Sequence, residues 1–194
     1  MNKPSPKVLF IGYGNPGRLD DGLGPALAAR IEALSMKGMT VESDYQLAVE
    51  NAFDVSKHDI VIFADAAVRG KAPFYFKEIH PRSPLSLGSH SVSPEAVLFF
   101  AERLFHSRVR AYVLGIRGYE FNGYDERLSE RAENNLEEAF QFVTKLVQSG
   151  NCNSMYLPDA ESRRPAANAQ RGRRKGEVRD GALEVQTRIK RKKR

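Results

Sequence analysis

Residues 8–24, with the sequence VLFIGYGNPGRLDDGLG, constrain the fold of this chain more than any other stretch. An unbroken apolar run leads into a glycine-rich turn, two adjacent acids and a segment with helical spacing. An apolar run bounded by Pro6 and Gly12 is typical of a strand buried on both faces, as in a parallel sheet. The stretch therefore predicts a strand over residues 7–11, a tight turn and a helix that begins at Asp21.

The rest of the chain alternates between strand and helix patterns in the same way. Apolar runs predict strands over residues 39–43, 59–65, 74–79 and 110–116, and helical periodicity predicts helices over residues 47–55, 94–105 and 129–148. Pro73 and Pro81 bracket one of these runs, which indicates an edge strand. The alternation predicts a doubly wound α/β fold, phosphorylase/hydrolase-like, with about five mostly parallel, twisted strands and helices on both faces.

The charge of the chain is divided unevenly along its length. Residues 151–194 contain 13 Lys and Arg against 5 Asp and Glu, whereas residues 1–150 contain 17 against 19. The first part is expected to form one α/β domain. The second has almost no apolar periodicity, and this composition predicts a disordered basic tail. Such a tail would bind nucleic acid or an acidic surface, or be a solvated extension, which is the simpler interpretation.

The chain also carries signals about its compartment. No run approaches the roughly 18 apolar residues of a membrane span, and no long apolar region follows the N-terminal charges. The single cysteine, Cys152, excludes an internal disulfide framework and fits a reducing environment. We therefore expect a cytoplasmic protein with no membrane partner.

The glycine-rich turn first suggests nucleotide binding. Gly12, Gly14 and Gly17 match the G-x-G-x-x-G pattern, in which a helix N-terminus holds a pyrophosphate. Here Asp20 and Asp21 occupy the entrance of the helix, and two carboxylates would repel a pyrophosphate. This interpretation is therefore disfavoured.

The same turn also resembles the opening of the peptidyl-tRNA hydrolases, and a basic tail would suit an RNA substrate. The resemblance ends at Gly17, because that family continues to a catalytic histidine whereas this chain has no histidine before His58. A peptidyl-tRNA hydrolase-like protein, or another nucleic-acid-associated protein that uses the tail, is kept as the alternative function.

A third interpretation, a metal site, explains more of the sequence. Asp20 and Asp21 follow the first expected strand, Asp65 ends the third, and His90 precedes the helix that opens with Ser93-Pro94. In doubly wound sheets ligands bind at the carboxyl ends of the strands, where these residues are expected to meet. Two carboxylates and an imidazole suit a divalent transition ion with open positions.

Each of these residues also has a plainer interpretation. Asp20 or Asp21 would cap the helix, and one of them is expected to do so. Asp65 would bond loop amides, and His90 would be a surface histidine. The aromatic residues of the polar loop 118–127 would either line a substrate groove or close the sheet edge; they are Tyr119, Phe121 and Tyr124.

Three motifs in one order resemble the nickel-iron hydrogenase maturation endopeptidases. They are Gly-x-Gly-Asn with Asp-Asp-Gly-x-Gly at 12–24, the strand that ends in Ala64-Asp65-Ala66, and Ser-His-Ser-Val-Ser-Pro-Glu at 89–95. The resemblance covers residues 7–148 and leaves residues 151–194 unexplained. It maps the metal-contacting residues of the family onto Asp21, Asp65 and His90, with Asp20 as the alternative to Asp21.

The resemblance implies a nickel-dependent aspartyl endopeptidase, a monomer. Its substrate would be the large-subunit precursor of a nickel-iron hydrogenase, from which it would remove a C-terminal extension after nickel insertion. The nickel would arrive with the precursor. Asp21, Asp65 and His90 would then serve both as metal contacts and as the catalytic residues.

Overall fold

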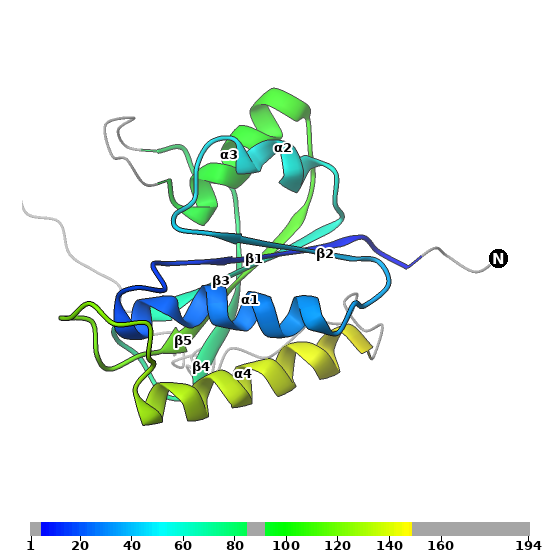
Figure 1. The fold of residues 1–194 in the computed structure, drawn as a ribbon. Coiled ribbons are helices and arrows are strands. Elements are labelled where there is room, and N and C mark those ends of the chain that lie inside the picture. Colours follow the sequence, from blue (N-terminus) through cyan, green and yellow to red (C-terminus); the bar gives the residue numbers. More distant parts are fainter. Residues whose placement is uncertain (1–4, 85–91, 149–194) are drawn as a thin grey trace, which may run out of the picture. The chain divides into compact units, whose positions relative to one another are not determined.

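The computed structural model describes residues 5–84 and 92–148 of the chain. These residues form one five-stranded sheet with helices on both faces (Figure 1). The strands are β1 (Val8–Tyr13), β2 (Met39–Asp44), β3 (Ile60–Ala67), β4 (Phe74–Ile79) and β5 (Arg110–Arg117), and their order in the sheet is β2-β1-β3-β5-β4. Neighbouring strands are parallel except β4, which pairs antiparallel with β5 at one edge. The fold predicted from the sequence is confirmed.

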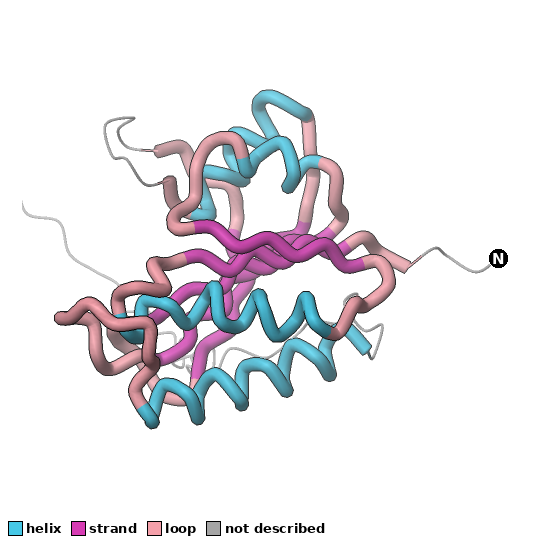
Figure 2. Tube along the Cα trace, viewed as in Figure 1, coloured by secondary structure: helices cyan, strands magenta, loops and turns pink. Residues whose placement is uncertain are grey.

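Two pairs of helices cover the sheet, as Figure 2 shows. The helices are α1 (Leu23–Ala33), α2 (Asn51–Ser56), α3 (Pro94–Phe105) and α4 (Glu130–Gln148), and a short 3-10 turn, η1 (Leu19–Gly22), precedes α1. Helices α1 and α4 pack on one face, and α2 and α3 pack on the other. None of these helices, within the described part of the chain, is both long and apolar enough to span a membrane.

The apolar runs of β1 and β3 are unbroken because helices cover both faces of the sheet. Phe10 and Ile62 point toward α1 and α4, whereas their neighbours Leu9 and Val61 point toward α2 and α3, and all four are fully buried. A strand that is buried on both faces has no position for a polar residue until it reaches an end of the sheet. The first polar side chains of β1 and β3 therefore lie at the edge of the sheet where ligands bind in such folds.

The start of α1 differs from the sequence prediction. Its N-cap is Gly22, no side chain caps the helix, and Asp20 and Asp21 lie one turn earlier in η1. The expected capping role of these acids is therefore wrong. By contrast, the predicted start of α3 is confirmed, because the Ser93 hydroxyl accepts a hydrogen bond from the Ala96 amide at 3.2 Å.

The glycines of the opening stretch allow α1 to lie directly against the sheet. A Cβ on Gly24 would come within 2.3 Å of the Tyr13 carbonyl oxygen and 2.5 Å of the Ala64 carbonyl oxygen. Gly14 has a φ of +138°, and a Cβ there would lie 2.1 Å from the Asp21 carbonyl oxygen. These glycines therefore bring η1 and α1 close to the ends of β1 and β3.

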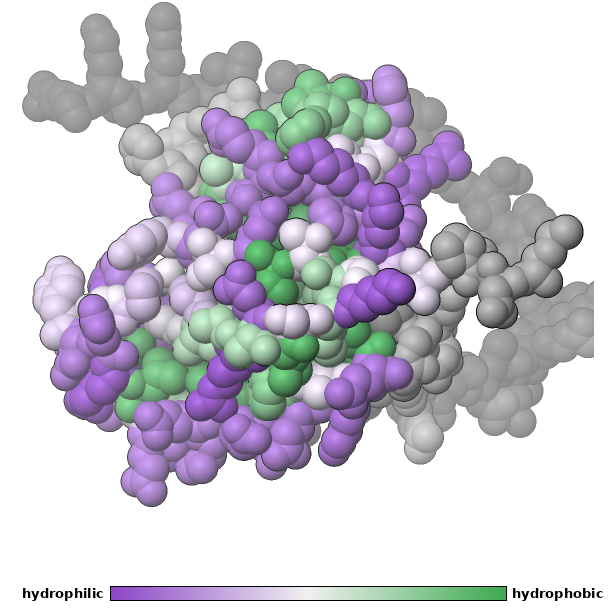
Figure 3. Space-filling model, turned by 45° about the vertical axis from the view of Figure 1, so that its right-hand side comes forward, coloured by the Kyte–Doolittle hydropathy of each residue, from purple (hydrophilic) through white to green (hydrophobic). Residues whose placement is uncertain are grey.

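Apolar side chains are also exposed on one part of the surface, where α2 lies beside the end of α3 (Figure 3). Phe53 and Phe105 pack against each other there with ring centroids 5.5 Å apart, and Leu104 is exposed beside them. The patch lies on the helical layer and includes none of the acids predicted for the site.

Candidate active site

Asp65 belongs to a row of four residues, one from each of four neighbouring strands. It pairs with Gly115 of β5, and Gly115 pairs with Tyr75 of β4. On the other side, Tyr13 follows Gly12, which pairs with Ala64, so Tyr13 continues the register beside Asp65. Because side chains alternate along a strand, all four positions belong to the face covered by α2 and α3.

The Asp65 carboxylate is held by two hydrogen bonds. Its Oδ1 accepts the Ala66 amide at 2.7 Å, and the Tyr13 hydroxyl donates to the carboxylate. Burial is the largest influence on its pKa and raises it, the Ala66 amide lowers it, the charge of Asp21 raises it and Tyr13 lowers it. The net result is a pKa of about 6. The surroundings of Asp65 thus disfavour the ionised form of its carboxyl group, and a pKa perturbed in this way is typical of functional sites.

The two tyrosines of the row remain protonated. Burial and then Asp65 raise the pKa of Tyr13 far above its ordinary value. Burial, followed by Asp65 and Glu95, also raises the pKa of Tyr75. Both phenols are therefore available as hydrogen-bond donors at the pH of the cell.

Asp21 is the second acid of the site. It is half-buried, and its Oδ2 accepts the Asn15 amide at 3.0 Å. Its charge raises the pKa of Asp65, so the structure brings together these two predicted residues, one from η1 and one from β3. Asn15 bonds its own turn as well, because its Oδ1 accepts the Gly17 amide at 2.9 Å.

Asp20 has a different role from its neighbour. It is fully buried, and it accepts four hydrogen bonds from the segment between β5 and α4. The Tyr119 and Glu120 amides donate to Oδ2 at 2.7 and 2.9 Å, the Ser129 amide donates to Oδ1 at 2.7 Å, and the Ser129 hydroxyl donates to Oδ2 at 2.8 Å. Burial opposes its charge, but these bonds outweigh burial and lower the pKa of Asp20. Of the two adjacent acids, Asp20 holds the scaffold and Asp21 faces Asp65.

The third predicted residue, His90, lies outside the described residues. Within residues 5–84 and 92–148, no group of three or more His, Cys, Asp or Glu side chains is arranged to hold a metal ion. The assignment of Asp21, Asp65 and His90 as a metal-binding set stays a prediction.

Only a weak signal in the sequence points to the two tyrosines as site residues. Tyr13 stands inside the glycine-rich turn motif, and Tyr75 is the second residue of an edge strand. Because the outermost strand β4 runs antiparallel to the others, its first residues lie at the end of the sheet where the parallel strands finish. Tyr75 therefore reaches the site from the beginning of its strand, where a search for polar residues after strand ends does not find it.

A cavity of about 480 Å³ lies beside η1, under the loop that Asp20 holds. Leu19, Tyr119, Phe121 and Tyr124 are among its lining residues, so the aromatic residues of this loop line a cavity. Arg127 pairs with Glu120 at 3.0 Å and with Asp125 at 3.4 Å, and so ties the loop to itself.

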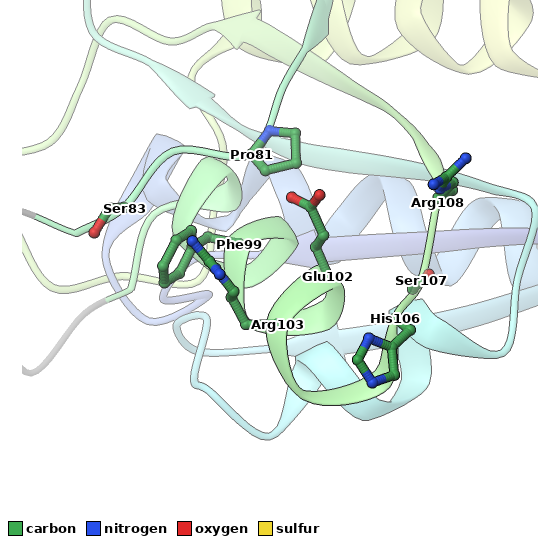
Figure 4. Close-up of a pocket in the computed structure, with 8 residues that line it drawn as sticks. All are labelled: Pro81, Ser83, Phe99, Glu102, Arg103, His106, Ser107 and Arg108. Atoms are coloured by element: carbon green, nitrogen blue, oxygen red, sulfur yellow. The ribbon is translucent and has the colours of Figure 1, made fainter.

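A larger cavity, of about 620 Å³, lies on the flank of α3 (Figure 4). Glu102, Arg103 and Arg108 contribute charged side chains to it and His106 contributes an imidazole, and all four residues are exposed. None of the acids or tyrosines of the candidate site lines this cavity, so its size does not identify it as the active site.

The fold is that of the hydrogenase maturation proteases. The chain is similar to the nickel-iron hydrogenase maturation protease HycI of Thermococcus kodakarensis, with a TM-score of 0.58 and 19% identity over 73% of this chain and 92% of that one. It is also similar to a hydrogenase 2 maturation peptidase of a Thaumarchaeota archaeon, with a TM-score of 0.55 and 22% identity over 73% of this chain and 98% of that one.

A third solved structure, the hydrogenase maturating endopeptidase HybD of Escherichia coli, has a TM-score of 0.52 and 21% identity over 74% of this chain and 94% of that one. Neither a protein-family model nor a curated protein matches the chain by sequence. The predicted resemblance is therefore confirmed at the level of the fold.

Proposed function

We propose that the chain is an endopeptidase that removes the C-terminal extension of a nickel-iron hydrogenase large-subunit precursor after nickel insertion. The observation that carries the proposal is the pair of Asp21, in the turn η1 that follows β1, and Asp65, near the end of β3, where the parallel strands of the sheet end. The pair lies in a fold shared with maturation proteases of archaea and of Escherichia coli.

The two acids and His90 would supply two oxygen ligands and one nitrogen ligand to the nickel that the precursor carries. Such a set leaves further positions for ligands from the precursor and for water. Metal ligands must be deprotonated, so binding of the cation would favour the ionised form of Asp65, which burial disfavours. A metal held beside a peptide bond polarises its carbonyl group or acidifies a bound water, and either effect promotes hydrolysis.

The arrangement also explains why processing would wait for nickel. Asp21 and Asp65 are acids held near each other, and the charge of Asp21 raises the pKa of Asp65. A divalent cation bound by these carboxylates would offset their negative charge. A precursor without nickel would lack the group that makes the site favourable, and it would not be held for cleavage.

The test is cleavage of a purified large-subunit precursor by the full chain, with and without nickel in the precursor. We expect cleavage of the nickel-loaded precursor only, and its loss in the variants Asp21→Asn, Asp65→Asn and His90→Ala. His80→Ala is the matched control, because His80 is exposed and belongs to no part of the site. Cleavage that persists in His90→Ala would remove His90 from the site. Equal cleavage of the precursor without nickel would refute the nickel requirement.

A further inference from the structure

Gly115, which pairs with Asp65, has no side chain and so leaves space in the row beside the Asp65 carboxylate. The row runs Tyr13, Asp65, Gly115, Tyr75 across β1, β3, β5 and β4, and only Gly115 has no side chain. Adjacent strands lie about 4.8 Å apart, so the glycine opens a gap one strand wide between the carboxylate and Tyr75.

The ring of Tyr75 fills this gap. A Cβ on Gly115 would lie 2.2 Å from Cζ, 2.3 Å from Cε1 and 2.6 Å from the hydroxyl oxygen of Tyr75. The end of the ring, including the hydroxyl, therefore lies over Gly115 and on the side of Asp65. Tyr75 is still 40% exposed, so a ligand that enters the site from solvent can reach it.

Among the described residues, the charged groups around the row are hydrogen-bond acceptors. The charged groups that act on Tyr13, Asp65 and Tyr75 are the acids Asp21, Asp65 and Glu95. A peptide substrate carries N–H groups, which these carboxylates can accept, and carbonyl groups, which need a donor. Tyr13 already donates to Asp65, which leaves the Tyr75 phenol as the donor that the row offers to a carbonyl.

We propose that Tyr75 is a substrate-binding residue whose hydroxyl, carried across Gly115, donates a hydrogen bond to a backbone carbonyl of the precursor peptide beside Asp65. The inference rests on the proposed function and names a contact of that same site. Gly115 takes part as the residue that makes room for the ring. The plainer possibility is that the Tyr75 ring only covers Gly115 of β5, in which case its hydroxyl is dispensable.

Two variants remove the contact in different ways. Tyr75→Phe removes only the hydroxyl oxygen. Gly115→Ala keeps the phenol but places a methyl group where the ring lies, and the half-exposed ring can swing away, so the fold tolerates the change. The double variant tests whether both act through one contact. Tyr45→Phe is the control, because Tyr45 is an exposed tyrosine outside the row.

The experiment measures kcat and KM for cleavage of the nickel-loaded precursor by the full chain, and the melting temperature of each variant. Loss of one hydrogen bond from an uncharged donor is expected to raise KM about tenfold and to leave kcat unchanged. We expect this result for Tyr75→Phe and for Gly115→Ala, no further loss in the double variant, and no change for Tyr45→Phe.

Other results overturn the assignment. If Tyr75→Phe cleaves like the wild type, the hydroxyl is not a substrate contact, whatever Gly115→Ala does. Losses that multiply in the double variant would mean that the two residues act independently, and a loss confined to kcat would mean that Tyr75 does not bind the substrate. If the wild-type chain does not cleave the precursor at all, the proposed function fails and this contact fails with it.

Discussion

Replacing Asp65 by asparagine is expected to make the protein more stable while it abolishes function. The folded protein raises the pKa of this carboxyl from 3.8 to about 6. At about 1.4 kcal/mol for each tenfold change in proton affinity, the ionised carboxylate destabilises the folded state by about 3 kcal/mol at neutral pH. Asparagine carries no charge, so it escapes both burial of a charge and repulsion by Asp21.

The gain has an upper limit set by hydrogen bonding. Asparagine has one acceptor oxygen, whereas the Asp65 carboxylate accepts from both the Ala66 amide and the Tyr13 hydroxyl. A hydrogen bond that must be shared or lost removes about 1 kcal/mol. We therefore expect Asp65→Asn to raise the free energy of unfolding by about 1–3 kcal/mol above pH 7.

The sign of the pH dependence identifies the cause. An acid whose pKa is raised by folding binds more protons in the folded state, so wild-type stability falls as the pH rises from about 4 to about 6. The advantage of Asp65→Asn is thus complete above pH 6–7, shrinks between about pH 6 and pH 4, and vanishes below the pKa of an unfolded aspartate, about 3.9.

The assay is urea denaturation of the metal-free full chain at pH 4.5, 6 and 7.5. Glu137→Gln is the control, because it makes the same change of carboxylate to amide in an exposed ion pair with Arg30. Such an exposed pair contributes at most about 1 kcal/mol to stability. If Asp65→Asn were less stable than the wild type at pH 7.5, or if its advantage did not change with pH, the reasoning from burial and repulsion would be refuted.

Three further predictions concern the scaffold. Asp20→Asn is expected to lose about 2–4 kcal/mol at pH 7 in urea denaturation, because buried amides lose a charged acceptor. That deficit is complete above the unfolded pKa of about 3.9 and disappears as the pH falls through the lower folded value, so a constant deficit would contradict it. Gly24→Ala is expected to lose at least about 1–3 kcal/mol by calorimetry, since its methyl group meets the backbone of β1 and β3, and a variant as stable as the wild type would disprove the close packing. Ser93→Ala is expected to lose about 1 kcal/mol through the cap of α3, and an unchanged melting temperature would show that the cap is dispensable.

Local patterns in the sequence were enough to predict most of the fold. The strands β1, β3 and β5 are buried on both faces, so their apolar runs are unbroken, and Ser93-Pro94 marks the start of α3 because a cap acts within one turn of helix. Asp65 is predictable as a site residue because it is the one acid at the end of an otherwise apolar strand. These features depend on neighbours in the chain, which a single sequence contains.

The division of roles between Asp20 and Asp21 depends on distant neighbours instead. The donors to Asp20 lie about a hundred residues further along the chain, and no local pattern indicates that Tyr119, Glu120 and Ser129 converge on it. Tyr75 was missed for a related reason, since its place depends on the register of β4 against β5. Long-range pairing, rather than residue type, decided both cases.

The adjacency of Asp20 and Asp21 has a mechanical consequence. One peptide bond joins the acid that holds the segment between β5 and α4 to the acid that faces Asp65. Asp20 is fully buried and accepts hydrogen bonds at both carboxylate oxygens, so its position is fixed. Any force that moves the loop above the groove must either break these bonds or turn the backbone at Asp21. The loop and the candidate site are therefore directly linked, because the residue that holds the loop and the residue that belongs to the site are neighbours in the chain.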